Sequence, residues 1–181
     1  RHADGQRQRH GRRAGIARVD PQRGITLRFL AEPTDVNFGG KVHGGAVMKW
    51  IDQAGYTCAA GWTGTYCVTV YLGGLHFLGP IHVGELVELR ALVIRTGRTS
   101  LDIAIDVYAG DPKSPERRRT GHCVVVFVAI GSDGKPAGVR PWRPETELDR
   151  ALEAYAGRLA ALRKQMDAEM EARLGREPHS R

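Results

Sequence analysis

The chain has 181 residues, 41% of them hydrophobic, and this composition is typical of one globular domain with flanking segments. Its longest apolar run, residues 123–130, is far too short to span a bilayer, and the polar start of the chain predicts no signal peptide. The formal net charge is +7, but most of the excess lies in residues 1–24, where seven Arg accompany two Asp, so the charge does not indicate a nucleic-acid-binding domain.

The segment of residues 1–24 is a leader rich in Gly, Gln and Arg. It is too polar to build a core, and we expect it to be disordered. A solvated tail is the favoured interpretation; an arm that binds polyanions, or an organellar presequence, is the alternative.

The three cysteines, Cys58, Cys67 and Cys123, are widely spaced and lie in apolar or strand-like contexts. An odd number of such residues favours free buried thiols in a reducing compartment. We therefore expect a cytoplasmic protein without a metal site and without membrane insertion.

The central segment, residues 25–145, begins with a strand pattern at residues 25–31, followed by a Gly/Pro/Asp-rich loop to residue 43. From Gly44 to about residue 60, apolar side chains recur at helical spacing and predict one helix. The period then changes to two. Five further runs are strand candidates: residues 66–72, 75–78, 85–96, 99–108 and 122–130.

The turn at residues 96–99, Thr-Gly-Arg-Thr, joins two long strand candidates and predicts an antiparallel hairpin. One early helix followed by antiparallel strands is an α+β pattern. Because the helix is apolar on most sides, we expect the sheet to wrap around it, which is the hot-dog arrangement. The prediction is thus a single hot-dog domain with a central helix.

The last segment, residues 146–181, is predicted to be an amphipathic helix over residues 146–174, with a short tail. Its heptad stripe consists of Leu148, Leu152, Tyr155, Leu159, Leu162 and Met166. We expect this helix to dock on its own domain or on a neighbouring subunit rather than to form a free coiled coil.

The central helix contains a carboxylate, Asp52, among apolar residues, which predicts a buried acid. Such a group is costly to keep ionised unless donors or a helix dipole compensate. A hydrogen-bonded core acid, or an acid on an exposed helix edge, is the alternative. Gly44 and Gly45 open the helix, where their N–H groups lack intrahelical partners and could form an oxyanion hole. Asp52, two turns further on, could serve as a general base.

Four motifs resemble the hot-dog acyl-CoA thioesterases of the cytosolic acyl-CoA hydrolase group. They are PTDVN at 33–37, GKVHGG at 40–45 followed by Met48 and Asp52, FLGPIHVG at 77–84, and TGRTS at 96–100. The resemblance covers about residues 25–145. It implies an active site shared across a subunit interface, with Asn37 and Asp52 in the positions of the family's Asn and Asp.

The implied reaction is hydrolysis of acyl-CoA to a fatty acid and CoA. Asp52 would be the general base or a nucleophile, Asn37 would orient water or the carbonyl, and the N–H of Gly45 would hold the oxyanion. His43 is a secondary catalytic candidate that is equally well explained as a structural hydrogen-bonding residue. No cofactor is implied, because CoA is part of the substrate.

The CoA phosphates are expected to bind Arg98, Thr99 and Ser100, by resemblance and because turn hydroxyls and N–H groups suit phosphate. A second basic cluster comprises Lys113 and residues 117–119, for which a solvated loop is the favoured interpretation. The acyl length is left open, because it depends on how Trp62, Tyr66, Tyr71 and Phe77 pack.

The expected assembly is a two-fold homodimer, because exposed sheet edges are normally paired or covered. The resemblance further implies a hexamer of three dimers, with the nucleotide end of CoA bound between dimers near Arg98. Other function classes are a non-catalytic acyl-CoA sensor, a hot-dog enoyl-CoA hydratase and an oligomerisation module. They are disfavoured because residues 1–24 are too short for a helix-turn-helix, no His follows Asp52, and an oligomerisation module leaves a buried acid unexplained.

Overall fold

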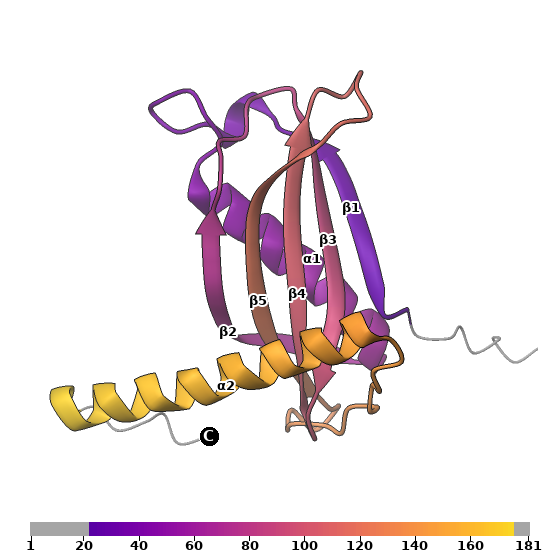
Figure 1. Ribbon diagram of the computed structural model, residues 1–181, viewed down its shortest axis with the longest axis vertical. Helices are drawn as coiled ribbons and strands as arrows, with labels where there is room; N and C mark the ends of the chain where they lie inside the picture. Colours follow the sequence, from indigo (N-terminus) through magenta and orange to yellow (C-terminus); the bar gives the residue numbers. More distant parts are fainter. Residues whose placement is uncertain (1–21, 176–181) are drawn as a thin grey trace, which may run out of the picture.

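The computed structural model describes residues 22–175, so nearly all of the predicted leader, and the end of the tail, lie outside the described residues. Five antiparallel strands form one sheet in the order β1-β3-β4-β5-β2. Their bounds are β1 Gly24–Leu30, β2 Tyr66–Phe77, β3 Leu86–Thr96, β4 Ser100–Gly110 and β5 Arg118–Ile130. Helix α1 (Gly44–Thr63) packs on one face and helix α2 (Glu147–Leu174) crosses the other (Figure 1). The predicted α+β class is confirmed.

Two strand candidates, residues 66–72 and 75–78, are one continuous strand, β2. Its register with β5 shifts between Thr69 and Tyr71 and again between Gly73 and His76. Gly74 in the second irregularity has a φ of 63°, a conformation that favours glycine. Irregular pairing of this kind breaks the alternation of side chains, which is why the sequence pattern looked like two strands.

Helix α1 buries one face against the sheet. The buried residues are Ala46, Val47, Trp50, Ile51, Ala54, Gly55, Cys58, Ala59 and Trp62. Gly55 allows a close approach, because a Cβ there would lie 2.7 Å from the ring of Phe127. The opposite face is exposed and carries Met48 and Tyr56. The predicted hot-dog arrangement, an antiparallel sheet packed around a central helix, is confirmed, and the face of α1 that the sheet does not cover stays exposed in the single chain.

Helix α2 begins and ends where the sequence predicts. Thr146 caps its start by accepting a hydrogen bond from the Asp149 N–H, and Gly175 ends it in the left-handed conformation. Leu152, Ala156 and Leu159 pack on an apolar patch on the outer face of the sheet, formed by Ile94, Ala104 and Val124 with Leu92. The prediction that α2 docks on its own domain is confirmed for this part.

The distal part of α2 extends past β2 after the guanidinium of Arg163 stacks on the ring of Tyr71 (Figure 1). Most of the predicted stripe is exposed: Leu148, Tyr155, Leu162 and Met166. Of the six stripe residues only Leu152 and Leu159 dock on the sheet, together with Ala156, so the docked stripe is narrower than the heptad pattern indicates.

Arg23 belongs to the folded domain and not to the leader in which the sequence placed it. Its Nε donates to the Val93 carbonyl at 3.0 Å, and its guanidinium pairs with Asp149 at 2.5 Å and stacks on Trp142. The side chain therefore ties the start of β1 to the start of α2.

The three cysteines are free and buried, as predicted. Burial raises the pKa of Cys58 and Cys123 to about 12, so both are held as thiols. Within residues 22–175, no group of His, Cys, Asp and Glu is placed to hold a metal ion. No helix of the described chain is long and apolar enough to cross a membrane.

Candidate active site

The loop between β1 and α1 is organised around Asn37. Its backbone N–H donates to the Lys41 carbonyl at 2.7 Å, and its side-chain Oδ1 accepts from the N–H groups of Gly39 at 2.8 Å and Lys41 at 3.3 Å. Because two N–H donors hold Oδ1, the side-chain NH₂ group remains available as a donor. Asn37 is exposed. The loop thus presents a fixed amide donor to solvent.

The start of α1 is capped by His43. Its Nδ1 accepts from the Ala46 N–H at 3.0 Å, so this ring nitrogen has the structural role that the sequence left open. A Cβ on Gly45 would lie 3.0 Å from that Nδ1, so the glycine leaves room for the cap. No acceptor for the N–H groups of Gly44 and Gly45 lies in the described part of the chain. Two donors at the positive end of the helix dipole are therefore free.

Asp52 is exposed on the open face of α1, which corrects the prediction of a buried acid. Its Oδ1 accepts a hydrogen bond of 2.5 Å from the hydroxyl of Thr69 on β2. Sequence reasoning missed Thr69, because the pairing of one strand residue with one helix residue is a tertiary feature. The hydroxyl fixes the orientation of a carboxylate that is otherwise open to approach.

One chain does not bring Asp52 to the Asn37 loop. A helix rises about 1.5 Å per residue, so the Cα atoms of Gly45 and Asp52 are separated by about 10 Å along α1. Two groups that act on one carbonyl must both lie within about 3–3.5 Å of the reacting atoms. The predicted residues therefore fall into two groups: Asn37, His43 and Gly45 in one, and Asp52 with Thr69 in the other.

The predicted phosphate-binding residues lie at the other end of the sheet. Arg98, Thr99 and Ser100 form or follow the β3–β4 turn, a hairpin that the structure confirms. The register pairs Leu30, at the end of β1, with Leu86, at the start of β3. Since the Asn37 loop follows β1 and the turn follows the far end of β3, the two are separated by the length of a strand (Figure 1). Arg98 is exposed.

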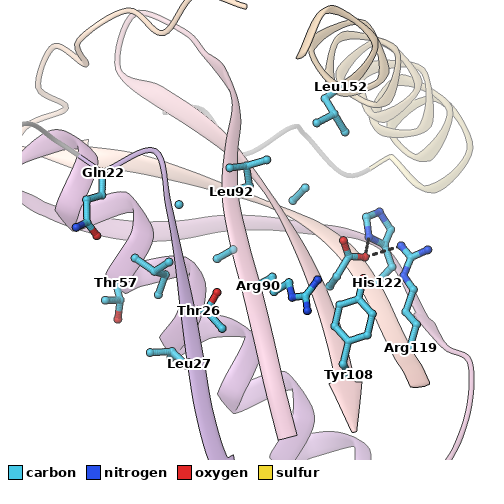
Figure 2. A pocket seen from close by; sticks show the side chains of 15 residues that line it. Gln22, Thr26, Leu27, Thr57, Arg90, Leu92, Tyr108, Arg119, His122 and Leu152 are labelled. Carbon is cyan, nitrogen blue, oxygen red and sulfur yellow. Dashed lines mark hydrogen bonds and ion pairs between the residues drawn. The ribbon is translucent and has the colours of Figure 1, made fainter. Parts of the chain in front are cut away.

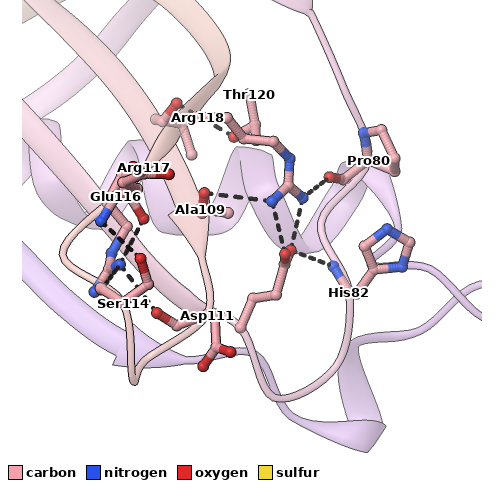
Figure 3. A network of polar contacts seen from close by, with 11 residues as sticks. Pro80, His82, Ala109, Asp111, Ser114, Glu116, Arg117, Arg118 and Thr120 are labelled. Carbon is pink, nitrogen blue, oxygen red and sulfur yellow. Dashed lines mark hydrogen bonds and ion pairs between the residues drawn. The ribbon is translucent and has the colours of Figure 1, made fainter.

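Two arginines of the second basic cluster, Arg117 and Arg118, are hydrogen-bonded within the molecule (Figure 3). Arg118 pairs with Glu85 at 2.6 Å and donates to the Pro80 carbonyl at 2.6 Å, and its hydrogen bond lowers the pKa of Glu85. Arg119 pairs with Asp106 on the outer face of the sheet. These arginines are not free for CoA, and Arg118 instead fixes the loop that follows β2.

A cavity of about 400 Å³ lies beside the Asn37 loop. It is lined by Asn37, Lys41, Val42, Gly44, Val47, Phe77, Leu78, Gly79, Pro80, Ile81 and Thr120. It adjoins one of the two groups of predicted site residues and is the first choice for a substrate pocket.

A larger cavity, of about 820 Å³, runs from the outer face of the sheet beside Leu152 of α2 around the β1 edge to Thr57 of α1 (Figure 2). It contains Asp106, whose burial opposes ionisation but whose pKa is lowered by the adjacent His122 and Arg119. None of the predicted site residues lines it. Its charged side chains are already paired, Arg119 and His122 with Asp106 and Arg90 with Glu88. The smaller cavity, which Asn37 and Gly44 line, is therefore the better candidate for the substrate pocket.

Comparison with known proteins agrees with the fold and the motifs. Residues 39–116 match the thioesterase superfamily. Protein VdlD of Helicobacter pylori is 32% identical over 142 residues, which are 78% of this chain and 79% of VdlD. The acyl-CoA thioester hydrolase YciA of Salmonella typhimurium is 35% identical over 120 residues, 64% of this chain and 90% of YciA. The chain belongs to the thioesterase superfamily.

Solved structures show the same architecture. The acyl-CoA hydrolase from Bacillus cereus is 27% identical with a TM-score of 0.75, and the match covers 82% of this chain and 91% of the hydrolase. A hexameric thioesterase from Yersinia pestis is 36% identical with a TM-score of 0.60, over 64% of this chain and 94% of that protein. A hexameric broad-specificity acyl-coenzyme A thioesterase is 30% identical with a TM-score of 0.62, and the match covers 74% of this chain and 99% of the thioesterase.

Proposed function

We propose that the chain hydrolyses acyl-CoA thioesters in active sites that are each built by two copies of the chain. The observation that carries the proposal is the separation of two complementary groups. The amide donor of Asn37 and the free N–H groups at the start of α1 suit a polarised carbonyl, whereas Asp52, held by Thr69, suits a base or nucleophile. The relative YciA is named an acyl-CoA thioester hydrolase, which supports the choice of substrate.

A two-fold dimer would bring the two groups together. The open face of α1 carries exposed Met48 and Tyr56, and the neighbouring edge strand β2 carries exposed Tyr66 and Leu72. Apolar side chains and an unpaired strand edge favour a partner that covers both. With two β2 edges paired and two α1 helices antiparallel, the start of one helix faces the middle of the other. Asn37 of one copy then approaches the partner's Asp52.

In this site the Asn37 amide and the Gly45 N–H would donate to the thioester carbonyl oxygen. The partner's Asp52 would take a proton from a water that attacks the carbonyl carbon. The tetrahedral intermediate would collapse with cleavage of the C–S bond, and the proton held by Asp52 would pass to the leaving sulfur, giving the free acid and the CoA thiol. Alternatively, the carboxylate of Asp52 would attack the carbonyl carbon directly, the C–S bond would break to release CoA, and water would then open the resulting anhydride. A single turnover in ¹⁸O-water distinguishes the two, since only the anhydride route can carry label into Asp52.

His43 is assigned to positioning, because its Nδ1 is occupied by the helix cap. This also disfavours an enoyl-CoA hydratase, which would use an Asp and a His together in chemistry. Arg98, Thr99 and Ser100 are proposed to bind the CoA phosphates from another subunit, since they lie far from the Asn37 loop of their own chain. Two similar proteins are hexameric, which supports an assembly of three dimers for this chain, and in such an assembly a neighbouring dimer would supply these residues.

The direct test is thiol release from a panel of acyl-CoA substrates by the purified chain. Asp52→Asn keeps the shape of the side chain but removes the basic carboxylate, so kcat should fall about a hundredfold or more while acyl-CoA still binds. Near-normal turnover by this variant would remove Asp52 from the mechanism. Light scattering should give at least a dimeric mass, and a fully active monomer would refute the shared site.

A further inference from the structure

The cavity beside the Asn37 loop begins at the position where the thioester carbonyl of the substrate is proposed to bind. Asn37 and Gly44 both line it, and Gly45 follows directly on α1. A thioester bound by the Asn37 amide and the Gly45 N–H therefore has its carbonyl at the rim of this cavity. One of the two arms of the substrate, the acyl chain or the pantetheine arm of CoA, must lie in or next to it.

The lining distinguishes these two arms. Val42, Val47, Leu78 and Ile81 supply apolar side chains, with the ring of Phe77 beside them. An alkyl chain has no hydrogen bonds to water to give up when it enters such surroundings. An amide that is buried there without a hydrogen-bond partner loses its bonds to water, which costs free energy.

Several polar groups around the cavity are already hydrogen-bonded. The Thr120 hydroxyl donates to the Val107 carbonyl at 3.2 Å, and the Ile81 carbonyl accepts from the Val42 N–H at 3.0 Å. The Pro80 carbonyl is held by an arginine (Figure 3). The two amides of a pantetheine arm would find these groups taken. The cavity therefore suits the acyl chain better than the CoA arm.

We infer that the acyl chain enters this cavity, and that Phe77 and Val47 set the length of chain that fits. The inference rests on the proposed acyl-CoA hydrolysis. Phe77 is 54% exposed at the end of β2, and its ring lies 3.4 Å from the position of a Cβ on Gly44, so it covers the mouth. Val47 is 5% exposed and lines the cavity from the first turn of α1. A volume of about 400 Å³ is near the low end of ligand pockets, roughly 300–1,000 Å³, and suits short and medium acyl chains.

The competing location is the exposed surface beyond Asp52, between α1 and β2. There Tyr56, one helical turn further along α1, lies beside Tyr66 on β2 with ring centroids 6.1 Å apart. If the acyl chain ran along this surface, the tyrosine pair would limit its length. Tyr56→Ala is therefore the control for Phe77→Ala, since each removes an aromatic ring that is exposed in the single chain. Because Tyr56 lies on the face that the partner is proposed to cover, light scattering must show that this variant keeps the wild-type mass.

The test measures Kd for a series of non-hydrolysable thioether analogues of straight-chain acyl-CoA, so the result does not depend on turnover. In the wild-type protein, Kd should tighten about fourfold per methylene while the cavity fills, and then stop improving at a defined length. Phe77→Ala should move this break to longer chains, and Val47→Ile should move it to shorter chains. Tyr56→Ala should leave it in place.

A break that moves with Tyr56→Ala and not with the cavity variants would overturn the inference, as would a series without a break. Thermal unfolding confirms that each variant folds, and if Val47→Ile does not, Phe77→Ala decides alone because its side chain is half exposed. Wild-type protein that binds the analogues as expected but releases no thiol from acyl-CoA would refute the hydrolysis and leave the pocket assignment standing. Failure to bind any analogue would refute both.

Discussion

The shared active site predicts that two inactive variants restore each other. Asn37→Ala removes the amide donor from one group, and Asp52→Asn removes the carboxylate from the other. If each site takes Asn37 from one copy and Asp52 from its partner, a heterodimer of the two variants contains one intact site. Its second site carries both substitutions and is inactive.

The size of the recovery follows from counting sites. Random mixing of equal amounts gives heterodimers as about half of all dimers, and each has one working site of two, so activity should return to about a quarter of the wild-type value. Heterodimers isolated with two different affinity tags should reach about half. Each parent should stay at about a hundredth or less, since each loses a group that acts in the transition state.

The assay is thiol release after subunit exchange, with the tags proving that exchange took place. A mixture of Asp52→Asn with Asp52→Ala is the matched control, because both copies lack the same group and no site can be repaired. Absence of recovery in isolated heterodimers would mean that each chain holds a complete site. That result would contradict the separation of about 10 Å between Gly45 and Asp52 along α1.

Three further predictions concern single residues. Thr69→Val removes the hydroxyl that orients Asp52, so kcat should fall about tenfold while KM changes little; an unchanged kcat would deny Thr69 a positioning role. Gly55→Ala places a Cβ 2.7 Å from the buried Phe127 ring, and this overpacking is partly offset by the higher helix propensity of alanine. The free energy of unfolding in urea titrations should therefore fall by about 1–2 kcal/mol. Backbone N–H groups at the start of α2, together with Arg23, lower the pKa of Asp149 from an ordinary value of 3.8 to about 2. The ionised Asp149 carboxylate therefore contributes its full stabilisation above about pH 4, and this contribution is lost as the pH falls toward 2. Asp149→Asn should lower the melting temperature at pH 7 and flatten its fall between pH 4 and pH 2, and an unaltered acid profile would contradict this assignment.

Much of the fold was predictable because local chemistry marks its elements. Gly44 opens α1 and α2 runs to Leu174 as the sequence indicates, and the turn at residues 96–99 forms the expected hairpin. The continuity of β2 was not predictable, since two register shifts break its alternation. Nor was the width of the docked stripe on α2, which is set by the apolar patch of a sheet formed from other parts of the chain.

The candidate site was predictable where function lies in consecutive residues. Asn37 and Gly45 belong to one loop and the helix that follows, and Asn37 lines one cavity together with Gly44, the neighbour of Gly45. Thr69 and Phe77 were not assigned such roles, because their contacts with Asp52 and Gly44 join β2 to α1 across many residues of sequence. The sequence alone indicates a solvated surface charge for Arg118, whereas its side chain holds the Pro80 carbonyl in the loop that lines the cavity.

The error about Asp52 and the expectation of a dimer have the same physical source. A hydrophobic pattern records burial in the final assembly and does not say which chain provides the cover. Met48 and Tyr56 make α1 apolar on the face that carries Asp52, yet the sheet of its own chain leaves both exposed at 44% and 39%. If a second copy covers this face, the acid becomes buried as the pattern indicates, and it does so next to the partner's Asn37. The exposure of Asp52 in the single chain is therefore an argument for the shared site.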